Sequence, residues 1–305
     1  MDSLVGGENN NKLKGGARRK MFVAKHCAPH KDTSKGSCLD KDLIMKIAKI
    51  LNKKRNINID LKLPLEEIHN EILEIIQSMN DCNSEACLLT MKDIIKQLGK
   101  DKKKFKESFK PLMPKEWKGD DNAWLSTDEI EESLKQFEKK NTDFHFYGAV
   151  PIDFSNCSVS NLCSFNLKKH MGKGDKKIGI VFNTDPHTRK GQHWISLYVD
   201  IQGQNLEGNP GVYYFDSYGR KPPKEIHKLI QKILKQGQKC KCKFNYFYND
   251  HSYQNINAQC GMYSIHFIQQ MLQGLSFRKF LKSGLNDKKM IHYRNQYFIN
   301  PNELK

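Results

Sequence analysis

The stretch YQNINAQCGMYSIHFI, residues 253–268, joins two different patterns in one segment. Its second half is apolar, so a helix is expected from Cys260 onward. Its first half is polar, with Gln254 six residues before the cysteine. A buried structural cysteine needs neither that glutamine nor the glycine that follows it, Gly261. The combination therefore indicates a nucleophilic thiol at the start of a helix.

Each residue of this segment has a chemical reason to be there. A thiolate is the nucleophile, and its free pKa of ~8.5 is lowered by an imidazolium or by a helix N-terminus. Gly261 would let a substrate chain approach Cys260. The side-chain amide of Gln254 and the backbone N–H of Cys260 are suited to stabilise an oxyanion. The alternative is that Gln254 is a loop glutamine that faces water.

Two residues upstream complete a catalytic set. His193 begins the strand-like run HWISLYVD (193–200), and Asp216 ends the next one, VYYFDS (212–217). Taken singly, a surface histidine, a turn aspartate and a core cysteine are ordinary features. Taken together, His193, Asp216 and Cys260 match a base, a residue that orients it, and a nucleophile.

The pattern of elements predicts an α+β fold. Ser126 and Glu129 form a capping box at the start of a helix in STDEIEESLKQF. A basic amphipathic helix is expected at about 223–236, and helices close the chain after Cys260. Helices before and after a small sheet are typical of this class. The expected strands are 178–183, 193–200, 212–217 and 243–249.

The N-terminal part has a different sequence pattern from the rest of the chain. Residues 39–112 place Leu43, Ile44 and Ile47 at helical spacing, and two prolines with a Gly-Asp-Asp turn follow at 111–123. Residues 1–36 are polar and glycine-containing, as a flexible leader would be. The predicted organisation is therefore a leader at 1–36, a helical arm at 37–120 and a catalytic core at 121–305.

Composition limits the compartment and the partners. The 305 residues contain no apolar run of the ~20 residues that span a bilayer and no signal-peptide pattern at the N-terminus, so no membrane insertion is expected. A cytosolic or nuclear-type compartment follows, with the nine cysteines as free thiols. The net charge of +17 favours contact with polyanions such as DNA. Residues 219–243, with nine Lys or Arg and one Glu, are the strongest basic run, although such runs are often solvated helix faces.

Metal binding is the weaker idea. Cys240 and Cys242, Cys82 and Cys87, and the cluster His26, Cys27 and His30 all lack the paired spacing of a zinc site. The catalytic set described above requires no cofactor.

The pattern His-Trp, then Asp-Ser, then Gln-x₅-Cys-Gly resembles the adenain and SENP-like SUMO protease superfamily of papain-like cysteine peptidases. Within it, the sequence is most similar to the African swine fever virus-type core-polyprotein proteases of large DNA viruses. The likeness is carried by NTDPHTRKGQHWISLYVD (183–200) and QNINAQCGMYS (254–264), and more weakly by GSCLDKDL (36–43), CNSEACLLT (82–90) and LSTDEIEESLKQF (125–137).

The resemblance implies a specific enzyme. Cys260 would be the nucleophile, His193 the base and Gln254 the oxyanion donor. Asp216 falls at the orienting position, where the swine fever type has asparagine and adenain-like relatives have an acid. Trp194 would line a narrow groove for small residues before the scissile bond, or it is a core tryptophan on its strand.

The family's biology gives the remaining expectations. They are cleavage of viral structural polyproteins at Gly-Gly-x sites during virion maturation, an N-terminal helical arm on the catalytic core, and action in the host cytoplasm at virus assembly sites and in the virion. Gly6-Gly7-Glu8 and Gly15-Gly16-Ala17 in the leader are such sites, which suggests self-trimming.

Two other functions remain open at this stage. One is a deconjugase for SUMO or another ubiquitin-like modifier, because such modifiers also end in Gly-Gly. The other is a basic DNA-binding or packaging protein with an inactive protease fold.

Overall fold

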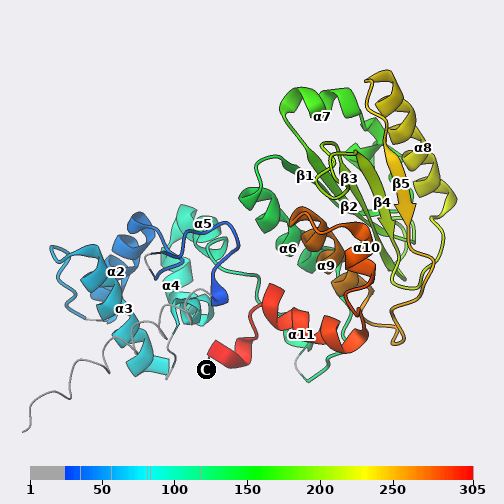
Figure 1. Cartoon of the computed structure of the whole chain (residues 1–305). Coiled ribbons are helices and arrows are strands. Elements are labelled where there is room, and N and C mark those ends of the chain that lie inside the picture. Colours follow the sequence, from blue (N-terminus) through cyan, green and yellow to red (C-terminus); the bar gives the residue numbers. More distant parts are fainter. Residues whose placement is uncertain are drawn as a thin grey trace, which may run out of the picture. The chain divides into compact units, whose positions relative to one another are not determined.

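The computed structural model describes residues 25–34, 36–55, 57–80, 82, 84–117 and 119–304. The predicted leader, 1–36, lies largely outside these residues. The chain divides into two compact units: unit 1, Met1–Met113 with Phe298–Lys305, and unit 2, Pro114–Tyr297 (Figure 1). The predicted core, 121–305, therefore differs from unit 2 at both ends. At the C-terminal end, Ile299 exchanges backbone hydrogen bonds with Pro111 and Met113, and this pairing places the tail in unit 1.

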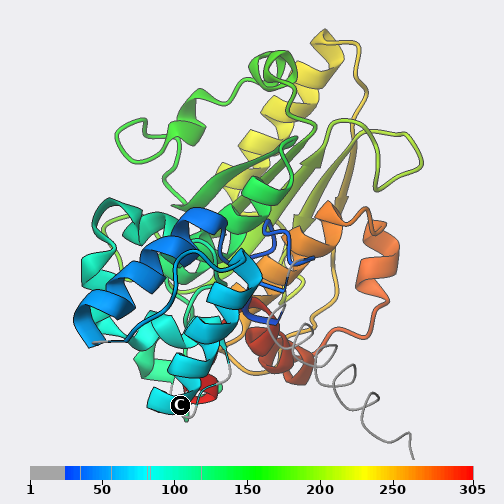
Figure 2. The same cartoon turned by 90° about the vertical axis from the view of Figure 1, so that its left-hand side faces the viewer.

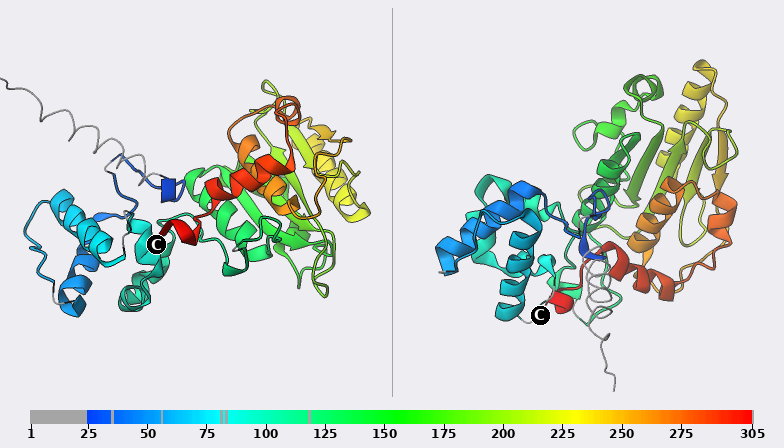
Figure 3. Two further views of the ribbon diagram at one scale, coloured as in Figure 1. Left: turned by 90° about the horizontal axis from the view of Figure 1, so that it is seen from below. Right: turned by 60° about the vertical axis from the view of Figure 1, so that its left-hand side comes forward.

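The regular elements of unit 1 are helices joined by loops, and the blue and cyan helices of Figure 3 pack against one another. Helix α2 buries Leu43, Ile44 and Ile47, the residues that the sequence placed at helical spacing. The expected N-terminal helices are thus present. Their bounds are α2 Lys41–Arg55, α3 Leu65–Asn80, η1 Glu85–Thr90, α4 Lys92–Gln97, η2 Gly99–Asp101, α5 Lys102–Lys106 and the C-terminal η5 Pro301–Leu304.

The cysteines depart from the expectation of free thiols. Three disulfides join Cys27 to Cys38, Cys82 to Cys87, and Cys157 to Cys163. Each pair is separated by 11 residues or fewer, so local turns bring the thiols together. The prediction of free thiols is wrong for these six residues. The remaining cysteines among the described residues are free: Cys240, Cys242 and Cys260.

Unit 2 is built on a five-stranded sheet in the order β1-β2-β3-β4-β5. The central pairs β2–β3 and β3–β4 are antiparallel, and the outer pairs β1–β2 and β4–β5 are parallel. The four predicted strands are confirmed within one or two residues at their ends. The strands are β1 Phe144–Pro151, β2 Lys177–Asn183, β3 Trp194–Asp200, β4 Gly211–Phe215 and β5 Asn245–Tyr248.

Strand β1 was not predicted. Gly148 and Pro151 interrupt its sequence, and both residues ordinarily weaken a strand assignment. The pairing with β2 shifts register between Phe146 and Ala149, and Gly148 has a φ of +99° there. A β-bulge therefore explains the glycine that made the strand hard to read.

Helices cover both faces of the sheet (Figures 1 and 2). The predicted capping box is present, because Ser126 and Glu129 cap α6 reciprocally. Outside the five strands, the helices of unit 2 are η3 Lys115–Trp117, α6 Thr127–Lys140, η4 Asn161–Ser164, α7 Leu167–Lys173, α8 Lys224–Lys239, α9 Cys260–Leu272, α10 Phe277–Leu281 and α11 Asp287–Tyr297.

The two faces differ in character. On one, α8 inserts Ile226, Ile230 and Ile233 into a wholly apolar cluster with alternate residues of β2, β3 and β4. On the other, α9 packs against β3 and is buried around almost its whole circumference. An apolar helix of that kind is either a core helix or a membrane span. None of the helices in the described part of the chain has the length and apolarity needed to cross a membrane.

Candidate active site

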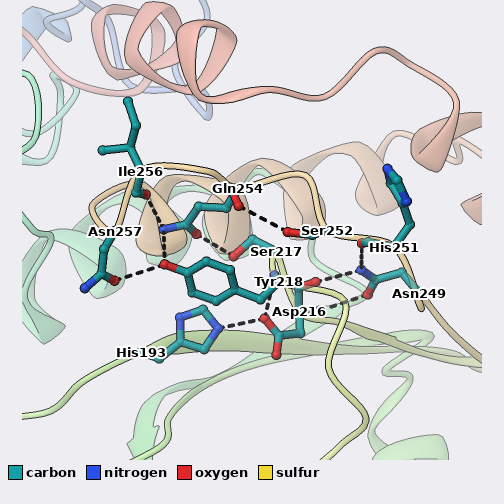
Figure 4. A network of polar contacts seen from close by, with 10 residues as sticks. All are labelled: His193, Asp216, Ser217, Tyr218, Asn249, His251, Ser252, Gln254, Ile256 and Asn257. Atoms are coloured by element: carbon teal, nitrogen blue, oxygen red, sulfur yellow. Dashed lines mark hydrogen bonds and ion pairs between the residues drawn. The ribbon is translucent and has the colours of Figure 1, made fainter.

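His193 and Asp216 lie at the same edge of the sheet because their strands are antiparallel neighbours. His193 directly precedes β3 and Asp216 directly follows β4. The His193 Nε2 and Asp216 Oδ1 atoms are 2.7 Å apart, and both side chains are buried. The backbone N–H of Tyr218 donates to the same carboxylate oxygen, and the Asn249 side chain bonds the Asp216 backbone N–H and C=O. Figure 4 shows the imidazole held from one side by this group.

The surroundings of His193 favour its protonated form. Burial alone lowers the pKa of the imidazole, because the cation loses its water. The hydrogen bond to Asp216 and the interaction with Cys260 outweigh burial and raise the pKa of His193 to about 9. Nε2 is committed to Asp216, and the buried Nδ1 has no other close partner among the described residues. Nδ1 is therefore the atom available to the Cys260 thiol.

Cys260 is the first residue of α9 and is buried. The residue before it, Gln259, makes no side-chain hydrogen bond that caps the helix. The first N–H groups of a helix have no partner within the helix, and they favour negative charge nearby. The thiol thus lies at the start of a helix and interacts with the His193 side chain.

Gln254 is almost completely buried, with 2% of its surface exposed. The Ser217 hydroxyl donates to its Oε1 at 2.6 Å. Its Nε2 donates to the Ile256 carbonyl at 2.7 Å and to the Tyr218 hydroxyl at 3.3 Å. The reading of Gln254 as a water-facing loop residue is therefore wrong. The side chain belongs to the network that holds Asp216 (Figure 4).

The loop that carries Gln254 is tied down from α11. The Asp287 carboxylate accepts the backbone N–H groups of Asn255 and Ile256 at 2.8 and 2.9 Å. The Tyr263 hydroxyl donates to the Tyr253 carbonyl and also lies 3.2 Å from Asp287. This buried aspartate fixes the approach of the loop to Cys260 by a route independent of the sheet.

A short segment before α6 crosses the start of α9. The Trp194 indole N–H donates to the Leu125 carbonyl at 2.8 Å, and a Cβ added at Gly261 would meet the Leu125 side chain at 2.9 Å. The packing of Leu125 thus explains why residue 261 is a glycine. The neighbouring Trp124 is 41% exposed and donates to the Asn257 carbonyl. The substrate-binding roles predicted for Trp194, which is buried, and for Gly261 stay predictions.

Sequence reasoning missed several residues that build the site. Tyr218, Asn249, Asp287 and Trp124 do not belong to the predicted set. Asp216-Ser217-Tyr218 resembles an ordinary turn sequence, and Asn249 merely follows a strand. The positions of Asn249 after a strand and of Asp287 at a helix start were usable signals, whereas Tyr218 and Trp124 are identified only by tertiary contacts.

Within the residues that the structure describes, no group of three or more His, Cys, Asp or Glu side chains is arranged to hold an ion. Cys27 and Cys38, like Cys82 and Cys87, are instead joined as disulfides.

The chain is similar to proteases of large DNA viruses. A thiol protease of Acanthamoeba polyphaga mimivirus is 36% identical over 184 residues, which are 60% of this chain and 59% of that protein. A SUMO-1 cysteine protease of African swine fever virus is 25% identical over 89% of this chain and 94% of its own length. The crystal structure of the African swine fever virus protease has the same fold, with a TM-score of 0.65, 23% identity and coverage of 90% of this chain and 95% of that one.

One family model matches more than half of the chain. It is the Ulp1 protease family, C-terminal catalytic domain, and it matches residues 127–304. The match begins at the first residue of α6 and includes the segments that contain His193, Asp216, Gln254 and Cys260. The chain therefore belongs to the Ulp1 protease family, a family of cysteine peptidases with viral relatives.

Proposed function

We propose that the protein is a cysteine endopeptidase with a Cys260–His193–Asp216 triad and Gln254 as an oxyanion donor. One observation carries this proposal: His193 Nε2 is bound to Asp216, so its Nδ1 remains for Cys260. A histidine used in this way takes one tautomer, and its cation is stabilised by the carboxylate.

The chemistry follows from that arrangement. His193 takes the thiol proton, and the Cys260 sulfur bonds the scissile carbonyl carbon while the C=O π pair moves to oxygen. The C–N bond then breaks, and the His193 proton goes to the leaving amine. Water, deprotonated by His193, attacks the thioester, the C–O bond forms, and the C–S bond breaks to restore the thiol. Asp216 keeps its charge throughout.

The oxyanion needs donors fixed in advance. The backbone N–H of Cys260 at the start of α9 is one, and the Gln254 amide is the second. One such donor contributes roughly 3 kcal/mol to transition-state stabilisation. Gln254 is suited to this role because Ser217 and Ile256 fix its amide plane at 2.6 and 2.7 Å.

The substrates that we propose are viral structural polyproteins with Gly-Gly-x sites, cleaved during virion maturation at assembly sites in the host cytoplasm and in the virion. Support comes from the motif resemblance and from the viral relatives. Trp124 and Trp194 lie beside the start of α9. Two such bulky side chains favour glycine, which has no side chain, at the substrate positions next to the thiol.

Deconjugation of SUMO is the second candidate, because one relative is named a SUMO-1 cysteine protease. The deciding experiment offers a Gly-Gly-x peptide and a SUMO–substrate conjugate side by side, with Cys260→Ala as control. Peptide cleavage that the substitution abolishes supports the endopeptidase. Cleavage of the conjugate alone supports the deconjugase.

The leader supplies a natural test of the same specificity. Gly6-Gly7-Glu8 and Gly15-Gly16-Ala17 lie outside the described residues, but both match the proposed cleavage motif. Intact-mass measurement of the wild type and of Cys260→Ala, expressed in the same way, should show a shortened chain only in the wild type. The same full-length N-terminus in both would refute self-trimming.

The outer face of α8 supports a DNA contact beside the protease role. It carries a lysine stripe, defined as Lys224, Lys228, Lys232, Lys235 and Lys239. All five are exposed, and none of them makes an ion pair within the described residues. The apolar side of α8 is buried in the core, so this helix is not free to insert into a membrane. The lysine stripe is about 22 Å long, and its positive charges have no acidic partners among the described residues. Such a row of charge is suited to contact a phosphate backbone.

Salt dependence tests that contact. Replacing four stripe lysines by glutamine should weaken binding of a labelled duplex and lower the slope of log K against log salt by about 0.9 for each phosphate that is no longer neutralised. Four glutamines at exposed lysines of unit 1, namely Lys49, Lys53, Lys54 and Lys62, serve as the matched control. Equal weakening in both variants would show that net charge alone is responsible. DNA binding retained in Cys260→Ala would separate binding from cleavage.

A further inference from the structure

Tyr218 lies between the two halves of the candidate site (Figure 4). Its ring packs on the His193 ring, with centroids 4.9 Å apart, and the Arg220 guanidinium covers it at 4.8 Å. Its hydroxyl reaches the oxyanion donor Gln254. The Tyr218 side chain therefore contacts both the proposed base, His193, and the proposed oxyanion donor, Gln254. The mechanism proposed above assigns no role to it.

The direction of the hydrogen bonds is fixed. The Tyr218 O–H donates to Asn257 Oδ1 at 3.0 Å, because an amide oxygen can only accept. The hydroxyl oxygen is then the acceptor for Gln254 Nε2. The other N–H of that amide donates to Ile256. Both Gln254 N–H groups are thus engaged in the free protein, although one of them is needed for the oxyanion.

The hydrogen bond to Tyr218 is the one that can be released. At 3.3 Å it is longer than the bonds of Gln254 to Ser217 and Ile256, at 2.6 and 2.7 Å. Those two shorter bonds define the amide plane without Tyr218. The hydroxyl is also within the electrostatic reach of the nucleophile: burial and then the charge of Cys260 raise the pKa of Tyr218.

We propose that Tyr218 is a positioning residue that holds one Gln254 N–H in the free enzyme and yields it to the oxyanion. The proposal rests on the donor role of Gln254 given above. When the substrate binds, moving the Gln254 N–H from the neutral Tyr218 hydroxyl to the neutral substrate carbonyl changes the free energy little. A charged oxygen makes the stronger hydrogen bond, so the exchange is favourable when charge has developed. Tyr218 thereby reserves the donor for the transition state rather than for the bound substrate.

Tyr218→Phe removes the hydroxyl and keeps the ring over His193. The freed N–H then binds the ground-state carbonyl and the oxyanion alike. We expect KM to fall and kcat/KM to rise by similar factors, roughly two- to tenfold, with kcat unchanged. A residue that merely supported the fold would instead lower kcat/KM.

A peptide aldehyde ending in Gly-Gly-al gives the sharpest readout. The Cys260 sulfur adds to the aldehyde carbon, the π pair moves to oxygen, and His193 keeps the thiol proton, so the adduct carries the oxyanion. Tyr218→Phe should bind this inhibitor two- to tenfold more tightly than the wild type, on the basis of roughly 0.5–1.4 kcal/mol for the released hydrogen bond. Weaker binding by Tyr218→Phe would overturn the proposal and make Tyr218 an ordinary support.

Controls separate this proposal from the function on which it rests. Tyr198→Phe deletes a buried hydroxyl that has no hydrogen-bond partner among the described residues and should leave inhibitor affinity unchanged. In a Gln254→Ala background, Tyr218→Phe should have no effect, because the N–H through which it acts is absent. A full effect in that background would refute the route through Gln254. Aldehyde affinity that survives in Cys260→Ala would refute the proposed nucleophile instead.

Discussion

The helices α8 and α9 pack on opposite faces of one sheet and are built by opposite rules. Helix α8 buries a single stripe, Ile226, Leu229, Ile230 and Ile233, and turns its lysines outward. Helix α9 is buried around almost its whole circumference, and its first residue is Cys260, the proposed nucleophile. The first helix contributes only apolar contact to the sheet. The second positions a functional group in the core, and a network of satisfied polar side chains has to surround that group.

From this difference we expect substitutions in the apolar stripe of α8 to change the stability of the protein, and substitutions at the start of α9 to change its catalytic rate. Changes at the start of α9 should abolish cleavage in a folded protein. Changes in the apolar stripe of α8 should unfold the protein without altering the chemistry of the molecules that stay folded. Changes in the outer lysines of α8 should do neither.

Cys260→Ala should produce the largest effect. Cleavage should fall by at least about 10³-fold, because the covalent step is lost. The melting temperature should change little, since a small side chain replaces another of similar size. Peptide cleavage and thermal unfolding of the same preparation check both statements. Residual activity above a tenth of the wild-type value would assign the nucleophile elsewhere.

Asp216→Asn should come next. The amide cannot stabilise the imidazolium as the carboxylate does, so kcat should fall by roughly 10²–10⁴-fold. The alkaline limb of the pH profile of kcat/KM, which the His193 pKa places near 9 in the wild type, should move to lower pH. An unmoved limb would show that another group governs it.

Ile230→Ala tests the α8 face. The side chain is fully buried in the apolar cluster, so the free energy of unfolding should fall by about 2–5 kcal/mol. Urea unfolding measures this change. Below the transition, kcat should equal that of the wild type, and a large drop in kcat would mean that α8 participates in the chemistry.

Protonation of His193 should couple stability to pH. Its folded pKa of about 9 exceeds the ordinary value of 6.5. The stabilisation is therefore complete below pH 6.5 and is lost as the pH rises through 9, an effect of about 3 kcal/mol. Unfolding free energies of the wild type and His193→Gln, compared at pH 6 and pH 9.5, isolate it. A difference that does not shrink at the higher pH would contradict the assignment.

The smallest effect belongs to the lysine stripe. Replacing Lys228 and Lys235 by glutamine removes exposed charges that have no ion-pair partners within the described residues, so stability should stay within about 0.5 kcal/mol of the wild type. Peptide cleavage should also be unchanged. A marked loss of stability would show that the stripe supports the fold rather than a partner.

The sequence predicted what depends on pattern. The apolar stripe of α8, four strands and the helix after Cys260 follow from periodicity, and the start of α6 follows from its capping box. His193, Asp216 and Cys260 were found because their residue types match one chemistry. The bulged strand β1 was missed, since Gly148 breaks its pattern and only pairing with β2 explains it. Tyr218 and Asp287 were missed because their hydrogen-bond partners at the site lie in distant segments of the chain.

The disulfides show a different limit. Odd cysteine number and irregular spacing predicted free thiols, but Cys157 and Cys163 meet across one short turn. Spacing along the chain does not report which thiols a turn brings together. Cys260, the first residue of α9, is one of the free cysteines among the described residues.

The proposed nucleophile is tested most directly by comparing cleavage of a Gly-Gly-x peptide by the wild type, Cys260→Ala and Cys242→Ala. Cys242 is also a free cysteine, half-buried and on the other side of the sheet with the α8 cluster. The Cys260–His193–Asp216 triad predicts wild-type rates for Cys242→Ala and background rates for Cys260→Ala. Cleavage that persists in Cys260→Ala, or that Cys242→Ala abolishes, would contradict it.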